Sequence, residues 1–314
     1  MDDPLIWVRA IHFGATMMVT GSVFFLAFIA EPAFRGAGDV PVAARIRARL
    51  AAMAWISLAV TVLSGAAWLV ELSVHMSELS RTQVLAQGVV WTVLSETDFG
   101  YDWMLRFALA VLLAVLLARP RMRAAAVGVS VGLVGTLAWA GHAGAGSGIE
   151  GAVHLTADVL HLVAAAAWFG ALLPLALLLH ATRRDPAESS VAIARAAVLR
   201  FSPLGVAGVG TLVATGAVNT WVLAGSVPAL VGTDYGHLLV MKVALFLVML
   251  LLGACNRLWF TPRAAHAQNA AAAAAALRQI GRNSLIEAGL GTIIIVIVGL
   301  LGTMPPSLQD LAID

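Results

Sequence analysis

The sequence predicts an all-α polytopic membrane protein with eight transmembrane helices. Of its 314 residues, 61% are hydrophobic and only 11% are charged, and the mean hydropathy is +0.92. Soluble domains carry about 25% charged residues. Apolar runs near the roughly 20 residues that span a bilayer also recur along the whole chain. Little of the chain is left for a separate soluble domain.

We place one span on each apolar run, in chain order. The first begins close to Met1 and is followed by no small-residue cleavage site, so we expect a retained helix and not a removed signal peptide. Residues 81–94 could form a short helix on the membrane surface, and the alanine-rich, basic run over 264–282 a second one. The expected spans are 5–30, 51–76, 102–118, 124–142, 153–179, 202–224, 236–260 and 284–304.

Arginine positions predict the orientation of these spans. All arginines except Arg9, Arg81 and Arg106 fall between spans one and two, three and four, five and six, or seven and eight, if Arg257 at the end of the seventh span is counted with the last of these connections. Positively charged connections face the cytoplasm, so both termini should face outward. No basic patch with interleaved aromatic residues points to nucleic acid as a partner.

An internal repeat is predicted from matches that occur in the same order in both halves of the chain. We expect two four-helix units, 1–150 and 151–314. An even number of helices in each makes the copies parallel, related by an axis along the membrane normal. The matches are 97–100 with 233–236, Arg106 with Lys242, 64–66 with 215–217, His12 with His161, and Gly21 with Gly170.

The fifth span carries the most unusual polar pattern of the chain. His154, Asp158 and His161 stand at i, i+4 and i+7, and Trp168 follows one heptad later, so all four share one helix face. Ionisable residues inside a membrane span are costly and mark functional sites. With most other polar residues mapping to the outer half, the pattern predicts a histidine-lined funnel open to the outside.

Histidines and methionines of the outer half are the candidate metal ligands. Imidazole nitrogen and thioether sulfur together suit copper. His154 and His161 lie about 10 Å apart along their helix, too far to hold one ion alone, and need partners. Asp158 could orient a ligating imidazole. Cys255, a lone thiol, is expected to be a small buried residue. The candidate ligands are His154, His161, His142, His12, Met17 and Met18.

Several charged and polar residues are expected near this site. Asp102 stands four residues before Arg106 and can neutralise it, whereas Lys242, the only lysine, needs a carboxylate from another span, such as Asp158. Thr211, Thr215 and Asn219 are expected to hydrogen-bond between helices. Glu71 is expected at the funnel rim.

These motifs resemble the copper resistance protein D family of bacterial inner-membrane proteins. The resemblance covers most of the chain and implies copper handling, commonly the movement of copper across the inner membrane with a periplasmic CopC-like copper-binding partner. It implies a metal site on His154 and His161 with His142 nearby. It rests on residues 141–147, 154–175, 214–221 and 233–257.

Three functions remain open at this point. The first is a copper-binding transporter, although the inner half shows no series of copper ligands beyond Met53, Met249 and Cys255, and no nucleotide-binding motif. The second is a redox protein in which His12 and His161 ligate a b-type haem from equivalent helices. The third is a copper receptor or scaffold that does not transport. We predict no catalytic residues, and an enzyme only in the haem case.

Overall fold

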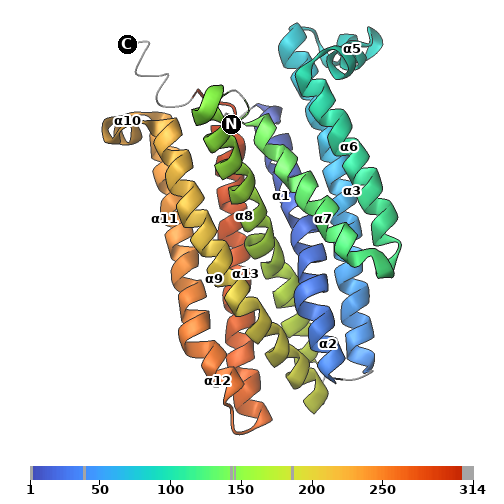
Figure 1. The fold of residues 1–314 in the computed structure, drawn as a ribbon, viewed down its shortest axis with the longest axis vertical. Coiled ribbons are helices and arrows are strands. Elements are labelled where there is room, and N and C mark those ends of the chain that lie inside the picture. Colours follow the sequence, from blue (N-terminus) through green and yellow to red (C-terminus); the bar gives the residue numbers. More distant parts are fainter. Residues whose placement is uncertain (1–2, 38–39, 142–143, 145, 185–186, 306–314) are drawn as a thin grey trace.

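The computed structural model describes residues 3–37, 40–141, 144, 146–184 and 187–305, and every regular element in these ranges is helical. Eight of the helices are long and apolar enough to cross a membrane, and they stand roughly side by side (Figure 1). The predicted all-α, eight-span fold class is confirmed.

Each span is formed by one helix or by a helix with short irregular ends. In the first half these are α1 (Pro4–Phe25) continued by the π-helical turn η1 (Leu26–Ala30) and α2 (Glu31–Ala37), then α3 (Pro41–Ser77), α6 (Asp98–Leu117), and η2 (Pro120–Met122) with α7 (Arg123–Gly135) and η3 (Thr136–Ala140). In the second half they are α8 (Gly148–Arg183), α9 (Glu188–Ala224), α11 (Asp234–Cys255) continued by η5 (Asn256–Phe260) and α12 (Thr261–Ala265), and α13 (Ala270–Leu301).

Four helices extend well beyond the apolar runs that predicted them. α3, α8, α9 and α13 have 37, 36, 37 and 32 residues, and their arginine-rich ends continue the helix where we expected connections. The expected separate helix over 264–282 is wrong, because from Ala270 onward this run is the first half of α13. Alanine and arginine favour helix strongly, so the chain stays helical after it becomes polar.

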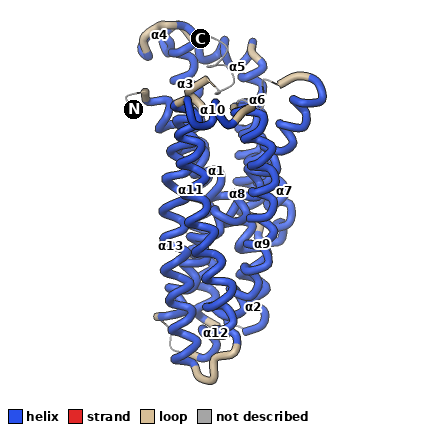
Figure 2. The backbone as a smooth tube through the Cα atoms, turned by 90° about the vertical axis from the view of Figure 1, so that its left-hand side faces the viewer, coloured by secondary structure: helices blue, strands red, loops and turns tan. Residues whose placement is uncertain are grey.

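The connection between the second and third spans forms two short helices, not one. α4 (Arg81–Ala86) begins with a capping box between Ser80 and Gln83, and α5 (Val89–Glu96) begins after Gly88. Gly88 has φ 71°, a left-handed conformation that glycine adopts without strain. Both helices lie at the end of the bundle that carries the N-terminus (Figures 1 and 2).

α1 and α8 lie at the centre of the bundle. α1 packs against α3, α8, α13 and α7, and α8 packs against α1, α9, α13 and α7. In the most apolar window of α8, 72% of the residues are buried, against 11% in α11 at the periphery. A Cβ added at Gly21 of α1 would overlap the backbone of Gly170 in α8. The two central helices therefore approach closely because both positions are glycine.

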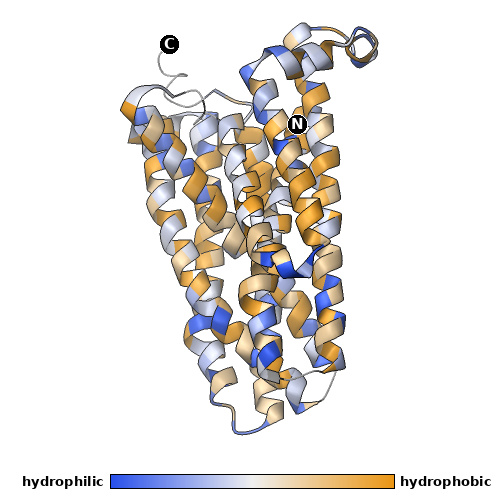
Figure 3. Ribbon diagram, turned by 45° about the vertical axis from the view of Figure 1, so that its right-hand side comes forward, coloured by the Kyte–Doolittle hydropathy of each residue, from blue (hydrophilic) through white to orange (hydrophobic). Residues whose placement is uncertain are grey.

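The helix surfaces that face away from the bundle are apolar. Leu63, Val111 and Leu251 are between 66% and 70% exposed on the shafts of α3, α6 and α11. Figure 3 shows hydrophobic residues over most of the length of the helices. Such extensive apolar exposure is expected of surfaces in contact with lipid.

Two junctions, one in each half of the chain, have the same local geometry. The Thr97 hydroxyl caps α6 by accepting from the amide of Gly100 at 3.0 Å, and Thr233 caps α11 by accepting from Gly236 at 3.0 Å. α10 (Val227–Gly232) precedes α11 as α5 precedes α6. The junctions agree with the predicted repeat, while the axis relating the complete halves stays a prediction.

Candidate functional site

The His12 site is formed where α1 packs against α3 and α6. The Nδ1 atom of His12 lies 3.0 Å from the carbonyl oxygen of Thr61 and 3.2 Å from the hydroxyl of Ser64. A carbonyl can only accept, so Nδ1 carries the proton and donates it. The Ser64 hydroxyl already donates to the carbonyl of Val60 and is therefore an acceptor here too.

The other ring nitrogen of His12 consequently holds a lone pair. Nε2 is buried and has no hydrogen-bond partner among the described residues. A second proton on the ring would place an imidazolium in a buried site close to Arg106. The neutral ring with a free Nε2 is the form of histidine that ligates metals.

Aromatic rings and cations enclose the His12 ring. The Trp68 and Trp103 ring centroids lie 5.5 and 5.2 Å from the His12 ring, and the Arg106 guanidinium lies 4.7 Å from the Trp103 ring. Arg106 pairs with Asp102 at 2.5 Å, as predicted, and Arg9 stacks on Trp68 at 4.7 Å. Two guanidinium groups and one carboxylate leave this site with a net positive charge.

The His161 site is formed between α8 and α9 and repeats the hydrogen-bond pattern. The Nδ1 atom of His161 lies 2.9 Å from the hydroxyl of Thr215, and that hydroxyl donates to the carbonyl of Thr211 at 2.6 Å. The Thr215 oxygen is therefore the acceptor, so Nδ1 carries the proton and Nε2 holds the lone pair. No hydrogen bond to this Nε2 occurs among the described residues.

Three polar residues lie around His161, and the negative charge of one balances the positive charge of another. Asn219 of α9 donates to the Asp158 carboxylate at 3.0 Å, and Lys242 of α11 interacts with the same carboxylate as an opposite charge. This attraction agrees with the predicted partner of Lys242. Arg9 stands three residues before His12, whereas Asp158 stands three before His161. One cation and one anion leave the His161 site without the positive charge of the His12 site, so it is the better site for a metal cation.

The remaining predicted ligands lie at different depths along α1 and α8. His154 is 5% exposed, about two turns from His161 toward the outer end of α8. Met17 is buried and its backbone oxygen faces Gly170, at the level of the helix crossing, and Met18 is half-buried. His142 lies outside the described residues.

Hydrogen bonds and ring contacts place His12 and His161 against different neighbours. His12 contacts α3 and α6, and His161 contacts α9. Within the described ranges, no three His, Cys, Asp or Glu side chains gather around one point. A metal site there would combine two such residues with methionine or water, and the predicted convergence of four imidazoles stays a prediction.

The space around His12 does not fit a haem. A haem beside His12 would need free space next to Gly14. Ile295 of α13 occupies that space, and a Cβ added to Gly14 would lie 3.8 Å from it. A Cβ on Gly65, behind the ring, would lie 2.7 Å from Trp103. Coordination of iron by His12 would require Trp68 and Trp103 to move, so the packing around His12 does not support the haem alternative.

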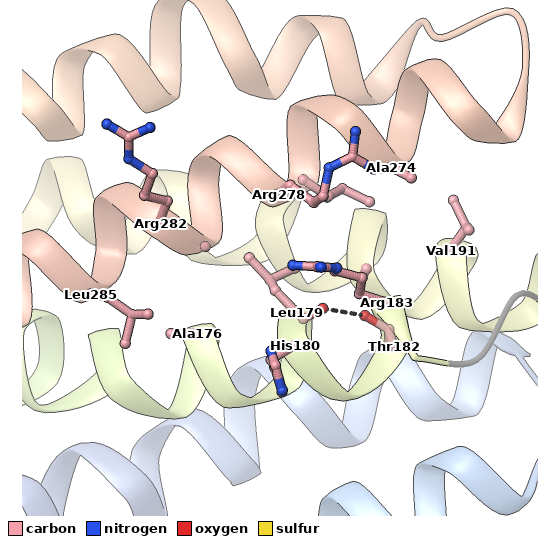
Figure 4. A pocket seen from close by; sticks show the side chains of 13 residues that line it. Ala176, Leu179, His180, Thr182, Arg183, Val191, Ala274, Arg278, Arg282 and Leu285 are labelled. Carbon is pink, nitrogen blue, oxygen red and sulfur yellow. Dashed lines mark hydrogen bonds between the residues drawn. The ribbon is translucent and has the colours of Figure 1, made fainter.

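Both ends of the bundle also carry groups that bear on the predicted orientation. At the end with α4, Glu71 pairs with Arg81 at 2.7 Å, as expected for a residue at the rim. At the opposite end, a cavity of about 180 Å³ opens between α8 and α13 (Figure 4), and a second of about 330 Å³ lies between α1, α3 and α6. The first is lined by His180, Arg183, Arg278 and Arg282, and none of the predicted ligands lines either cavity.

These features define a class of protein before any relative is considered. The chain is a multi-pass helical membrane protein in which the buried imidazole of His12 and the half-buried imidazole of His161 lie between the spans, each with a ring nitrogen free to bind a metal. Comparison with known proteins then identifies the family. The chain belongs to the copper resistance protein D family, because it is 31% identical over 316 residues to copper resistance protein D of Pseudomonas syringae pv. tomato, covering 98% of this chain and 99% of that protein.

Other relatives and two family profiles agree with this assignment. Inner membrane protein YebZ of Escherichia coli (strain K12) is 28% identical, with 96% of this chain and 98% of that protein covered. Copper transport protein CutJ of Bacillus subtilis (strain 168) is 34% identical over 178 residues, 54% of this chain and 32% of that protein. "Copper resistance protein D-like, N-terminal domain" matches residues 1–152, and "Copper resistance protein D" matches 195–301. No solved structure matches.

Proposed function

We propose that this protein binds copper arriving from the periplasmic side at the His161 site and moves it inward. The observation that carries the proposal is the hydrogen bond between His161 and Thr215. It fixes the proton on Nδ1 and leaves the Nε2 lone pair for a metal, the arrangement that orienting partners impose on ligating histidines.

The charge of the site supports a cation as the cargo. Asp158 offsets Lys242 next to His161, whereas the His12 site already holds two guanidinium groups against one carboxylate. A copper ion added to the His12 site would meet like charge in a buried environment, which is costly. We therefore assign copper binding to the second half, with His154 on the same helix face as the outer ligand and His142 as its candidate neighbour.

The family gives the copper assignment its biological setting. The relatives carry the names copper resistance protein D and copper transport protein. We propose that a periplasmic CopC-like copper-binding protein delivers the ion to the outer end of α8. The protein supplies no covalent chemistry in this account and acts as a membrane copper carrier of the inner membrane, with both termini in the periplasm.

Copper uptake into proteoliposomes tests the proposal. Vesicles with the wild-type protein should accumulate copper, and vesicles with His161→Ala should fall to the level of empty liposomes. His180→Ala, at the other end of the same helix, is the matched control and should transport normally. Wild-type protein that binds copper in detergent but gives no uptake would contradict transport and favour a receptor or scaffold.

A further inference from the structure

A second buried polar cluster lies in the inner half of the bundle, where the sequence shows no series of copper ligands. Glu287 of α13 is 1% exposed, and its Oε1 accepts a hydrogen bond from the side-chain amide of Asn256 at 3.0 Å. Asn283 donates to Asn256 at 2.8 Å, and Gln279 donates to Asn283 at 3.1 Å. These three amides form a chain of hydrogen bonds that ends on the carboxyl of Glu287.

Glu287 lies near the middle of α13 along its length. It is 17 residues from the start of α13 at Ala270 and 14 from its end at Leu301, about 25 Å and 21 Å at the helical rise. The residues of the amide chain on α13, at 279, 283 and 287, follow one another at steps of four. They therefore share one face and lead from the middle of the bundle toward the arginine-rich end.

No cation neutralises this carboxyl within the described part of the chain. Among the described residues no ion pair includes Glu287, and its one side-chain partner is the neutral amide of Asn256. Arg257, which follows Asn256 in the sequence, donates to Ser202 at 2.7 Å, while Arg278 and Arg282 on α13 line the cavity facing α8. An isolated carboxylate in so buried a position would be very costly, and such groups become neutral instead.

The direction of the hydrogen bonds shows which oxygen can hold the proton. Oε1 accepts from Asn256, so a proton on the carboxyl belongs on Oε2. Oε2 faces Gly253 of α11, where even an added Cβ would lie 3.7 Å away. Asn256 begins the π-helical turn η5, and such turns occur frequently at functional sites.

We propose that Glu287 is a proton-binding site of the inner half of the bundle: its carboxyl holds a proton on Oε2 in the packed state and exchanges it with the cytoplasmic side along the face of Asn283 and Gln279. The site is separate from the copper ligands. The site supplies a group through which a proton can move when the bundle opens. The proposal does not depend on whether the protein carries copper.

Infrared difference spectroscopy of the protein in lipid tests this assignment. The wild type should show a carboxylic acid band at neutral pH that shifts in D₂O, and Glu287→Gln should lose it. The amide of glutamine can still accept from Asn256, so the variant should fold. The matched control is Glu31→Gln, because Glu31 pairs with Arg47 at 2.7 Å and Arg123 at 3.0 Å and is ionised. This control should keep the band.

Carbodiimide labelling of the unmodified protein gives an independent readout. The reagent reacts with protonated carboxyls in apolar surroundings, so peptide mass spectrometry should find the adduct on Glu287 and not on Glu31. A band unaffected by Glu287→Gln, or absence of the adduct from Glu287, would overturn the proposal. Replacement of Gln279 and Asn283 by leucine should slow deuterium exchange of the band; unchanged exchange would overturn the route along α13.

Copper uptake tests the proposed function separately from the protonation of Glu287. If wild-type vesicles transport copper, Glu287→Gln should bind copper normally but lose the response of uptake to an imposed pH gradient. If the wild type does not transport at all, the proposed function fails while the infrared band still decides the state of Glu287.

Discussion

Hydroxyl groups on α3 and α9 determine what two histidines between the spans can do. The hydroxyls of Ser64 and Thr215 each donate a hydrogen bond to a carbonyl of their own helix, so each can only accept from the histidine beside it. The imidazole must then donate through Nδ1, and Nε2 is left for a metal. The Thr215 hydroxyl alone therefore sets the tautomer of His161, and the Ser64 hydroxyl acts together with the Thr61 carbonyl at His12.

Removal of the Thr215 hydroxyl should weaken copper binding without unfolding the protein. Thr215→Val keeps the shape of the side chain but leaves His161 Nδ1 without an acceptor, and loss of such an orienting partner costs about 10–100-fold in metal affinity. Competition with a chromogenic copper chelator measures the change. Thr215→Ser should restore affinity, and Thr211→Val, one turn away and bonded only within α9, should leave it unchanged. Equal affinities for wild type and Thr215→Val would show that the hydroxyl does not orient the ligand.

The sequence predicted individual residues better than their contacts. Spacing alone singled out His12 and His161, and the demand of a buried lysine for a counter-charge led from Lys242 to Asp158. Which nitrogen of each ring is free depends on hydroxyls of other helices and could not be predicted from one helix. Glu287 and Asn256 are 31 residues apart, and their contact depends on how α11 packs on α13. A lone carboxylate within an apolar span was the available signal, because such a group needs either a partner or a proton.

At the scale of elements, the close approach of α1 and α8 decides where the histidines sit. His12 and His161 each stand nine residues before a glycine of the crossing, about 13 Å along the helix. The crossing therefore fixes both imidazoles at the same depth on two adjacent helices. Any side chain at the crossing must separate the helices that carry them.

Gly21→Ala should destabilise the protein by about 1–3 kcal/mol, the range for overpacking a closely packed interior. The added methyl group overlaps the backbone of Gly170, which has no side chain that could move aside. Thermal unfolding in detergent measures the loss. Gly128→Ala in α7 is the matched control, because a Cβ there meets nothing within 4 Å, and it should be neutral or slightly stabilising. A Gly21→Ala protein as stable as the wild type would contradict the close crossing.

Apolar runs predicted the number and order of the spans but not their ends. Hydropathy falls where arginines begin, yet helix propensity does not, so α3, α9 and α13 continue past the predicted limits. The break between α4 and α5 depended on the left-handed backbone at Gly88. The sequence shows that glycine but does not show that the chain uses it to end a helix.

At the scale of the whole molecule, charge divides the bundle into two ends. The arginine-rich cavity (Figure 4) lies between the C-terminal part of α8 and the N-terminal half of α13, at the end that carries α12, and α4, α5 and α10 lie at the other end (Figures 1 and 2). The positive-inside tendency assigns the first end to the cytoplasm. Copper should then meet the outer end of α8 first, and the Glu287 cluster should be reached from inside.

Cysteine accessibility tests this orientation. In a Cys255→Ala background, Thr82→Cys on α4 should react with a membrane-impermeant maleimide in intact cells. Arg121→Cys, in the turn between α6 and α7, should react only after the membrane is opened. Both positions are exposed, so access to the reagent is the only difference between them. The reverse pattern would place both termini in the cytoplasm and turn the copper site inward.

Metal and pigment content of the purified protein is the most direct test of the central claim, which is that a lone pair on His161 Nε2 binds copper. The account predicts bound copper in the copper-loaded wild type, loss of tight copper binding in His161→Ala, full retention in His180→Ala, and no Soret absorption in any of the three. A His161→Ala protein that retains the copper of the wild type, or a wild type that carries haem instead, would contradict it.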